Sequence, residues 1–201
     1  MRYPSTHSDH TRRRIIRSAR KLFNRFGFDR VSVEQIMADA SLTRGGFYRH
    51  FKSKSDLYAE VLTCFFTDPL WVDTWEGVSL DLNASDAGPQ IIRAYLSRQH
   101  AENIDNACPM VALPSDVARA GESAKRAFER TFTAMVDVLQ RSVRGNDARR
   151  TALAIAALCV GGMVIARASN ARHLSDELRD AATGVALKLG GWNEAVARKR
   201  R

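Results

Sequence analysis

The sequence lacks the marks of several common protein classes. It has only three cysteines, Cys64, Cys108 and Cys159, an odd number without close spacing, which argues against a disulfide framework and against a zinc site. No apolar run approaches the roughly 20 residues that span a bilayer, and the first residues contain no apolar signal core. We therefore expect a cytoplasmic protein with reduced thiols, without a membrane partner, a metal or a cofactor.

The motifs of common enzymes are also missing. The sequence has no strand pattern, no glycine-rich phosphate loop, no Gly-x-Ser-x-Gly elbow and no His-Glu-x-x-His pair. His100 with Glu102 or Asp105 could suggest acid–base or metal chemistry, but a solvated or hydrogen-bonded helix end explains these residues more simply. The sequence thus predicts an all-α protein that is not an enzyme.

Positive charge is concentrated at one end of the chain. Residues 1–55 hold 13 of the 31 lysines and arginines and 4 of the 22 acidic residues, so the whole formal excess of +9 lies there. A basic surface confined to one segment is typical of polyanion binding, whereas scattered charge would indicate only solubility. With 201 residues, 45% of them hydrophobic, the chain can bury one sizeable core or two small ones.

Residues 32–54 contain two short helix patterns separated by a tight turn. Ser32 can cap the first helix, with Gln35 closing a capping box, while Ile36 and Met37 supply an inward face. Thr43 can cap the second helix. This is the pattern of a helix-turn-helix; a compact helical hairpin that does not bind DNA is the alternative, and the local charge favours DNA binding.

The second helix carries residue types that suit a major groove. Gly45 and Gly46 allow close approach, and Arg44 can reach a guanine edge, while Phe47 and Phe51 lie four apart on the inward side. The candidate DNA contacts here and in the flanking helices are Arg12, Arg13, Arg14, Ser32, Thr43, Arg44, Gly45, Gly46, Tyr48, Arg49, His50, Lys52 and Lys54. The three N-terminal arginines and the lysines among them are expected to contact phosphates, and Arg44 a base.

The sequence resembles the TetR/AcrR family of transcriptional regulators over roughly its first 60 residues. The resemblance lies in ARKLFNRFGF (19–28), VSVEQI (31–36) and TRGGFYRHFKSK (43–54). It implies a homodimeric helical protein, usually a repressor, that leaves a palindromic operator when a small ligand fills its C-terminal domain. It also implies that Arg44 and Gly46 face bases, that Tyr48 and His50 bind phosphates, and that Lys54 binds a phosphate at the next helix start.

Four segments are expected: a disordered arm (1–8), a helix-turn-helix DNA-binding domain (9–55), a helical bundle for ligand binding and dimerisation (56–192) and a basic tail (193–201). Helices are expected at about 9–26, 89–102, 122–143, 147–169 and 175–189. The last two are so apolar that a second subunit is their natural cover, although an internal core would also bury them. We therefore predict a homodimer through these two helices.

The effector is expected to be a small hydrophobic molecule. Apolar side chains exceed what a small bundle needs, and the candidate lining residues are Phe65, Phe66, Trp71, Trp75, Met110, Phe128, Phe132 and Met135. Two alternatives stay open. One is redox sensing through Cys108, whose loop position before Pro109 could leave the thiol accessible. The other is a DNA-binding protein without a ligand.

Overall fold

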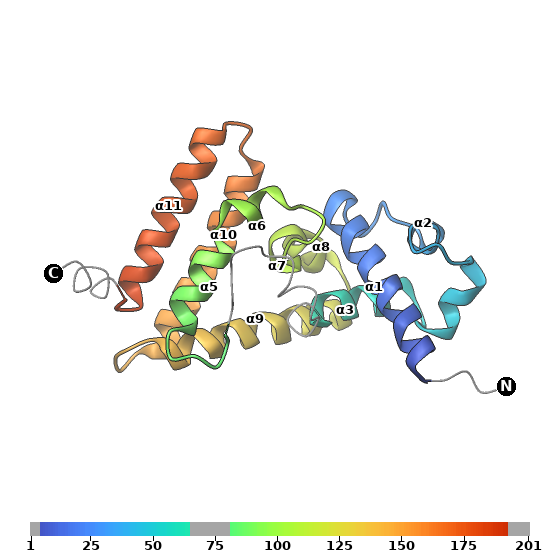
Figure 1. Ribbon diagram of the computed structural model, residues 1–201, viewed down its shortest axis with the longest axis horizontal. Coiled ribbons are helices and arrows are strands. Elements are labelled where there is room, and N and C mark those ends of the chain that lie inside the picture. The colour runs from blue at the N-terminus through green and yellow to red at the C-terminus, as the bar shows by residue number, and fades with distance from the viewer. Residues whose placement is uncertain (1–4, 65–80, 193–201) are drawn as a thin grey trace. The chain divides into compact units, whose positions relative to one another are not determined.

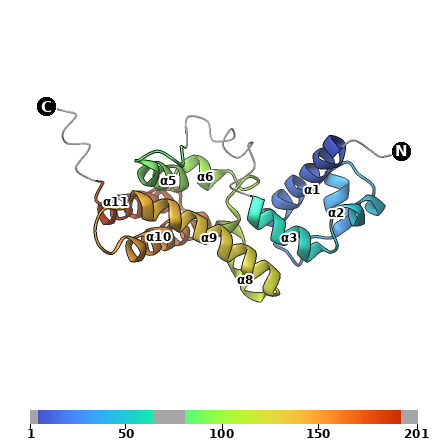
Figure 2. The ribbon, with the colours of Figure 1, turned by 90° about the horizontal axis from the view of Figure 1, so that it is seen from below.

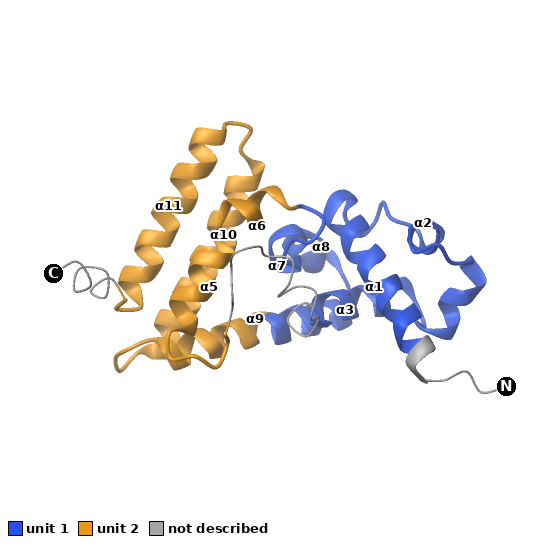
Figure 3. Cartoon of the chain, in the orientation of Figure 1, with its two compact units in different colours: residues 1–68, 104–131 blue, residues 69–103, 132–201 orange. Residues whose placement is uncertain are grey.

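The computed structural model describes residues 5–64 and 81–192 (Figure 1). These residues form helices and turns and contain no strand, which confirms the all-α prediction. The chain divides into two compact units (Figure 3): unit 1 comprises residues 1–68 and 104–131, and unit 2 comprises residues 69–103 and 132–201.

Unit 1 contains the helices nearest the N-terminus and a short segment from the middle of the chain. The long first helix begins at Ser5, a few residues before the expected start, and ends before Gly27, whose φ of 78° suits glycine. The elements of unit 1 are α1 (Ser5–Phe26), α2 (Val33–Asp39), the 3₁₀ helix η1 (Arg44–Arg49), α3 (Lys54–Thr63), α7 (Pro109–Ala112), α8 (Pro114–Arg119) and the first half of α9 (Glu122–Ser142).

Large aromatic rings fill the core of unit 1. Phe23, Phe47, Phe51 and Tyr58 are almost completely buried. The rings of Phe23 and Tyr58 meet edge to face, with centroids 5.3 Å apart, and those of Phe47 and Phe51 lie 5.7 Å apart. Such pairs add specific geometry to the burial of large apolar areas, so they fix how α1, η1 and α3 pack together.

Residues 104–131 belong to unit 1 because polar contacts and apolar packing join them to α1. Asn24 Nδ2 donates to the carbonyl of Ala107 at 3.1 Å, and Asp116 Oδ2 accepts from the backbone N–H of Phe28 at 2.8 Å. Leu113 and Val117 also enter the same hydrophobic core. The division seen here therefore differs from the single boundary near residue 55 that the sequence suggested.

Unit 2 is built on two long helices, α10 (Ala148–Ala168) and α11 (Arg172–Leu189), which lie side by side (Figures 1 and 2). They approach closely at Gly162, because this residue has no Cβ atom. A Cβ atom there would lie only 3.0 Å from Cβ of Ala182. Small residues thus allow these two helices to pack closely within the protomer. The elements are α5 (Ala87–Tyr95), α6 (Arg98–Glu102), the second half of α9, α10 (Ala148–Ala168) and α11 (Arg172–Leu189).

The single helix expected at 89–102 is two helices, α5 and α6. Ser97 starts the second one, since its hydroxyl accepts from the backbone N–H of His100 at 3.1 Å. Two arginines complete the helix ends: Arg179 Nη1 donates to the carbonyl of Leu96 at 3.0 Å, and Arg167 Nη2 donates to the carbonyls of His100 and Asn103. Arginine side chains therefore satisfy three of the carbonyls at the ends of α5 and α6.

Among the described residues, α10 is the one helix whose length and composition would allow it to cross a membrane. The expectation that no apolar run approaches that length was therefore wrong for α10. About a third of its most apolar window (33%) is buried inside the protein, against α11, α5 and α6. The apolar side chains left exposed on this helix and on α11 bear on assembly, which is treated under Proposed function.

Candidate nucleic-acid interface

The first helix of the helix-turn-helix, α2, starts as the sequence predicted. Ser32 Oγ accepts from the backbone N–H of Gln35 at 3.2 Å, and the Gln35 side chain accepts from the backbone N–H of Ser32 at 2.8 Å. This reciprocal pair is the predicted capping box. Ile36 and Met37 are buried beneath it, so the helix has one fixed inward face.

The turn after α2 is tight and cross-linked. Ser41 has a φ of 54°, which places it in the left-handed region, and the N–H of Leu42 donates to the carbonyl of Met37 at 2.8 Å. Arg14 on α1 donates to the carbonyl of Ala40, the C-cap residue of α2. The turn therefore holds the next element in a defined direction relative to α2.

The second helix of the motif is a 3₁₀ helix, η1, and not the α-helix that the sequence suggested. The N–H groups of Gly46 and His50 donate to carbonyls three residues earlier, at 3.0 and 2.9 Å. Thr43 occupies the cap position, but its side chain forms no capping hydrogen bond. Two adjacent glycines in a six-residue helix supply little α-helical propensity, which accounts for the tighter form.

This short helix separates its apolar residues from its polar ones. Phe47 and, just beyond the helix, Phe51 are buried, whereas the side chains of Arg44, Tyr48 and Arg49 are exposed. A Cβ atom at Gly45 would meet no heavy atom within 4 Å, so this position faces open space. One face of η1 thus presents an arginine, a tyrosine and a glycine to a partner outside the protein.

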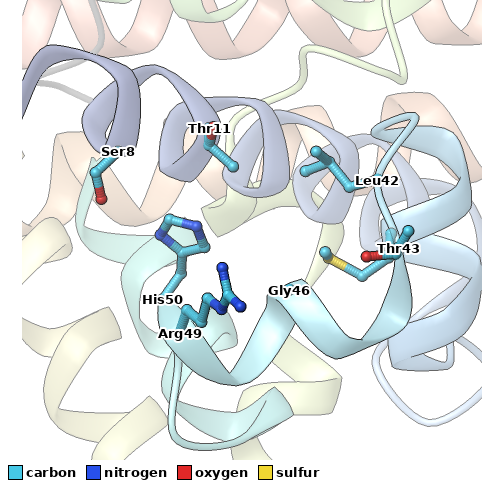
Figure 4. Close-up of a pocket in the computed structure, with 8 residues that line it drawn as sticks. Ser8, Thr11, Leu42, Thr43, Gly46, Arg49 and His50 are labelled. Atoms are coloured by element: carbon cyan, nitrogen blue, oxygen red, sulfur yellow. The ribbon is translucent and has the colours of Figure 1, made fainter. Parts of the chain in front are cut away.

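A hollow of about 320 Å³ lies between the start of α1 and η1. In Figure 4, Ser8 and Thr11 of α1 face Arg49 and His50 across this hollow. Partial burial lowers the pKa of His50 below its usual value, and the charges of Arg12 and Arg49 lower it further. His50 therefore gives up its proton more readily than an exposed histidine, in a hollow that is lined by polar side chains and by the apolar side chains of Met37 and Leu42.

The three N-terminal arginines differ in what they contact. Arg12 forms a two-pronged contact with the Glu60 carboxylate and lies over the Phe51 ring, 4.4 Å from its centre. Arg14 is used by the turn described above, whereas Arg13 is exposed. In this geometry Arg12 and Arg14 hold α1 against its neighbours, so Arg13 is the best placed of the three for a phosphate.

Lys54 also has an internal role. Its ammonium group donates to the carbonyls of Phe28 and Val31, at 2.9 and 3.0 Å, and lies over the Phe28 ring. This leaves one of its three N–H donors for another acceptor. Lys52 is exposed, and Ser53 is the N-cap of α3, since its hydroxyl accepts from the N–H of Asp56 at 3.0 Å.

Sequence reasoning missed the acidic residues that organise this surface. Glu34 on α2 forms an ion pair with Arg44, with 2.8 Å between Oε1 and Nε. Asp39 accepts from Lys21 at 2.7 Å and from Ser18 at 2.5 Å, and these hydrogen bonds lower its pKa. No spacing rule could have found these pairs, because they join residues on different elements.

The expected ligand residues fall into two groups. Phe65, Phe66, Trp71 and Trp75 lie outside the described residues. Met110 and Phe128 are in unit 1, where Met110 is buried and Phe128 packs against the core; Met135, buried, and Phe132, half-buried, are in unit 2.

Cys108 is completely buried. The expectation that its loop position leaves the thiol accessible was therefore wrong. Cys108 occupies the N-cap position of the short helix α7 without a side-chain capping hydrogen bond, and it is buried together with Pro109, Met110 and Val111 of that helix.

Together, α2, the turn and η1, braced by α1 and α3, define a helix-turn-helix domain with a basic outer surface. Residues 15–61 match the model of the family described as bacterial regulatory proteins, tetR family. The transposon Tn10 TetC protein of Escherichia coli is 34% identical over 83 residues, which are 41% of each chain. The sequence match thus spans less than half the length of that relative.

Solved structures extend the likeness to most of the chain. The reduced form of Escherichia coli NemR superposes with a TM-score of 0.68 at 16% identity, covering 88% of this chain and 95% of that one. A complex of SmeT with triclosan superposes with a TM-score of 0.62 at 22% identity, covering 89% and 90%. At such identities the likeness shows the fold alone. Residues 15–61 are thus similar to the N-terminal domain of the tetR family of bacterial regulatory proteins, and most of the chain shares the helical fold of these solved structures.

Proposed function

We propose that this protein is a sequence-specific DNA-binding regulator, a repressor that binds a palindromic operator as a homodimer in the cytoplasm. The observation that carries the proposal is the exposed face of η1, where Arg44, Tyr48 and Arg49 point outward above buried Phe47. The net charge of +9 in residues 1–55 supports it, because phosphate neutralisation supplies much of the affinity for DNA.

In this proposal Arg44 reads a base, and exposed cations around it bind phosphates. Arg44→Ala should cost about 1–3 kcal/mol on the preferred duplex and relax the preference at one position per half-site. Lys52→Ala is the matched comparison, because Lys52 is exposed and makes no side-chain contact that the turn needs. It should weaken all sequences alike and reduce the salt slope by about one.

The experiment starts from a library of duplexes with a random core, from which the wild-type protein selects its preferred sequence. Fluorescence anisotropy then compares that duplex with its scrambled version. Equal losses on both duplexes for Arg44→Ala would remove the base-reading role. Lys54 is a poorer phosphate probe, since its replacement would also release the carbonyls of Phe28 and Val31.

The dimer is proposed from the apolar surface of α10 and α11. Exposed large apolar residues gather on these helices in unit 2: Leu153, Val164, Ile165, Leu174, Val185 and Leu189. Gly161 and Gly184 add positions where a Cβ atom would meet nothing within 4 Å. Such a surface is typical of one covered by another chain, and a two-fold dimer also doubles the number of DNA bases read.

Val185→Glu tests this assembly, since Val185 is 51% exposed and its replacement leaves the core of unit 2 intact. An unpaired carboxylate in an apolar interface is unfavourable, so the variant should sediment as a monomer and lose operator affinity. Ala134→Glu, on an exposed position of α9, is the control and should remain dimeric. Ala182 is unsuitable because it is already buried against α10. A monomeric wild type with tight palindrome binding would contradict the proposal.

The proposed effector is a small hydrophobic or aromatic molecule that favours the geometry in which the protein does not bind DNA. It can act only through a difference in affinity between the two geometries. SmeT, which shares this fold, is known in complex with triclosan, so triclosan is a suitable first probe. Release of the selected duplex on titration with triclosan or other apolar aromatics supports the proposal. A panel of such compounds that leaves DNA affinity unchanged would favour a regulator without a ligand.

A further inference from the structure

The ion pair between Glu34 and Arg44 joins the two helices of the helix-turn-helix at its outer surface. Arg44 Nε lies 2.8 Å from Glu34 Oε1, and the two side chains are 68% and 48% exposed. They are ten positions apart in sequence, with the turn at Ser41 between them. Both helices are independently fixed, α2 by its capping box and by Arg14, and η1 by buried Phe47. The pair is therefore a contact between two rigid elements.

The contact engages the part of the guanidinium group that base reading does not need. Arginine has five N–H donors, and the four on its two Nη atoms form the planar end that matches O6 and N7 of guanine. With Nε paired to the Glu34 carboxylate at 2.8 Å, the ion pair restrains the guanidinium group before DNA arrives and leaves its Nη atoms for a base. Ordering a long side chain in advance reduces the entropy lost on binding.

Glu34 also has an electrostatic effect of its own. Its backbone N–H and Ser32 hold its pKa below the usual value, and the charge of Arg44 adds to this, so the carboxylate stays ionised at neutral pH. A fixed negative charge beside η1 repels DNA phosphates. The repulsion weakens binding to every duplex, and the base contact of Arg44 restores affinity only on the preferred sequence.

We propose that Glu34 is a specificity-determining residue of the DNA interface, which positions Arg44 for one base and weakens binding to all other sequences. This inference rests on the proposed function, in which Arg44 reads a base. It is distinct from a role in folding, because exposed ion pairs contribute little to stability.

The test uses the full chain with the single changes Glu34→Gln and Glu34→Asp, Arg44→Ala, and the double change Glu34→Gln with Arg44→Ala. Glu122→Gln is the control, since Glu122 forms a similar exposed ion pair with Arg126 on α9. Anisotropy measures the affinity of each for the selected palindrome, for every single-base variant of one half-site, and for a random-sequence duplex. Thermal melting of each free protein shows whether folding has changed.

Glu34→Gln should reduce the ratio of affinities for the preferred base and the other bases at the Arg44 position by about fivefold or more. It should also raise the affinity for random duplex by about two- to tenfold. Glu34→Asp separates the positioning of Arg44 from the repulsion of phosphates, because it keeps the negative charge on a shorter side chain. The base preference should become weaker, while the affinity for random duplex stays low. In the Arg44→Ala background, Glu34→Gln should cause no further loss of base preference. Glu122→Gln should change none of these quantities.

Three results would overturn the inference. If Arg44→Ala flattens the base preference but Glu34→Gln leaves it intact, Arg44 reads the base without help from Glu34. If Glu34→Gln lowers the melting temperature and weakens all duplexes alike, the residue has only a structural role. If Arg44→Ala itself leaves the base preference unchanged, the reading role of Arg44 fails, and the inference fails with it.

Discussion

The two units of this protein are stabilised in different ways. Unit 1 has a core of large aromatic rings around Phe23, Phe47 and Tyr58, and its large exposed apolar residues, such as Phe26 and Ile104, are scattered. Unit 2 relies on small residues, with Gly162 against Ala182, and its exposed apolar residues gather on α10 and α11. The comparison indicates that unit 1 completes its own core, whereas unit 2 leaves an apolar surface that the proposed dimer would cover.

The largest expected effect is on the aromatic core. Phe47→Ala removes a fully buried ring from unit 1 and should lower the free energy of unfolding by about 3–5 kcal/mol. Tyr48→Ala removes the neighbouring ring, which is 63% exposed, and should cost less than about 1 kcal/mol. Urea denaturation followed by circular dichroism measures both changes. Similar losses for the two variants would contradict the description of unit 1 as a closed core.

A second prediction concerns pH and the buried His100 of unit 2. Burial lowers the pKa of His100 to about 3, and the charge of Arg167 adds to this, while its Nδ1–H donates to the carbonyl of Tyr95 at 2.6 Å. The unfolded state, with a pKa near 6.5, binds the proton more tightly. The contribution of His100 to the free energy of unfolding is thus fully present above about pH 6.5 and is lost as the pH falls toward 3. At pH 5 the loss is about 2 kcal/mol.

Denaturation curves at pH 5, 6 and 7.5 check this. His100→Gln should remove that part of the pH dependence, and His173→Gln, at an exposed position on α11, should keep it. An identical pH dependence in wild type and His100→Gln would show that other groups cause it.

The packing of α10 allows a paired test of moderate effects. Gly162→Ala places a methyl group 3.0 Å from Ala182 and should cost about 1–3 kcal/mol. Gly161→Ala meets nothing within 4 Å in the protomer and should stabilise the helix by about 0.5–1 kcal/mol. If Gly161→Ala instead weakens the assembly measured by sedimentation, then a second chain packs at that position.

The smallest expected effect is proton uptake on DNA binding. The pKa of His50 is lowered in the free protein, and a nearby phosphate would raise it in the complex. The affinity for DNA should then increase as the pH falls from the pKa of His50 in the complex to its pKa in the free protein. The increase is at most about tenfold per pH unit for each subunit. Anisotropy from pH 6 to 8 measures this dependence, and His50→Gln should flatten it. A dependence that persists in His50→Gln would assign it elsewhere.

Local patterns predicted much of unit 1 and of its basic surface. The capping box at Ser32, the side-chain cap at Ser53 and the inward pair Phe47 and Phe51 follow from residues three or four apart. Such spacings report neighbours on one helix and nothing beyond it. The internal roles of Arg12 and Lys54 were therefore not visible, because Glu60 and the carbonyl of Val31 lie on other elements.

The sequence by itself determined the helical fold, the place of the helix-turn-helix and the concentration of positive charge, because helix periodicity, capping and composition are local properties. Only the tertiary structure decided that residues 104–131 join the N-terminal unit, that Cys108 is buried, and that Glu34 holds Arg44. These features depend on contacts between residues far apart in the chain. Such contacts are set by the packing of whole elements, which no short stretch of sequence contains.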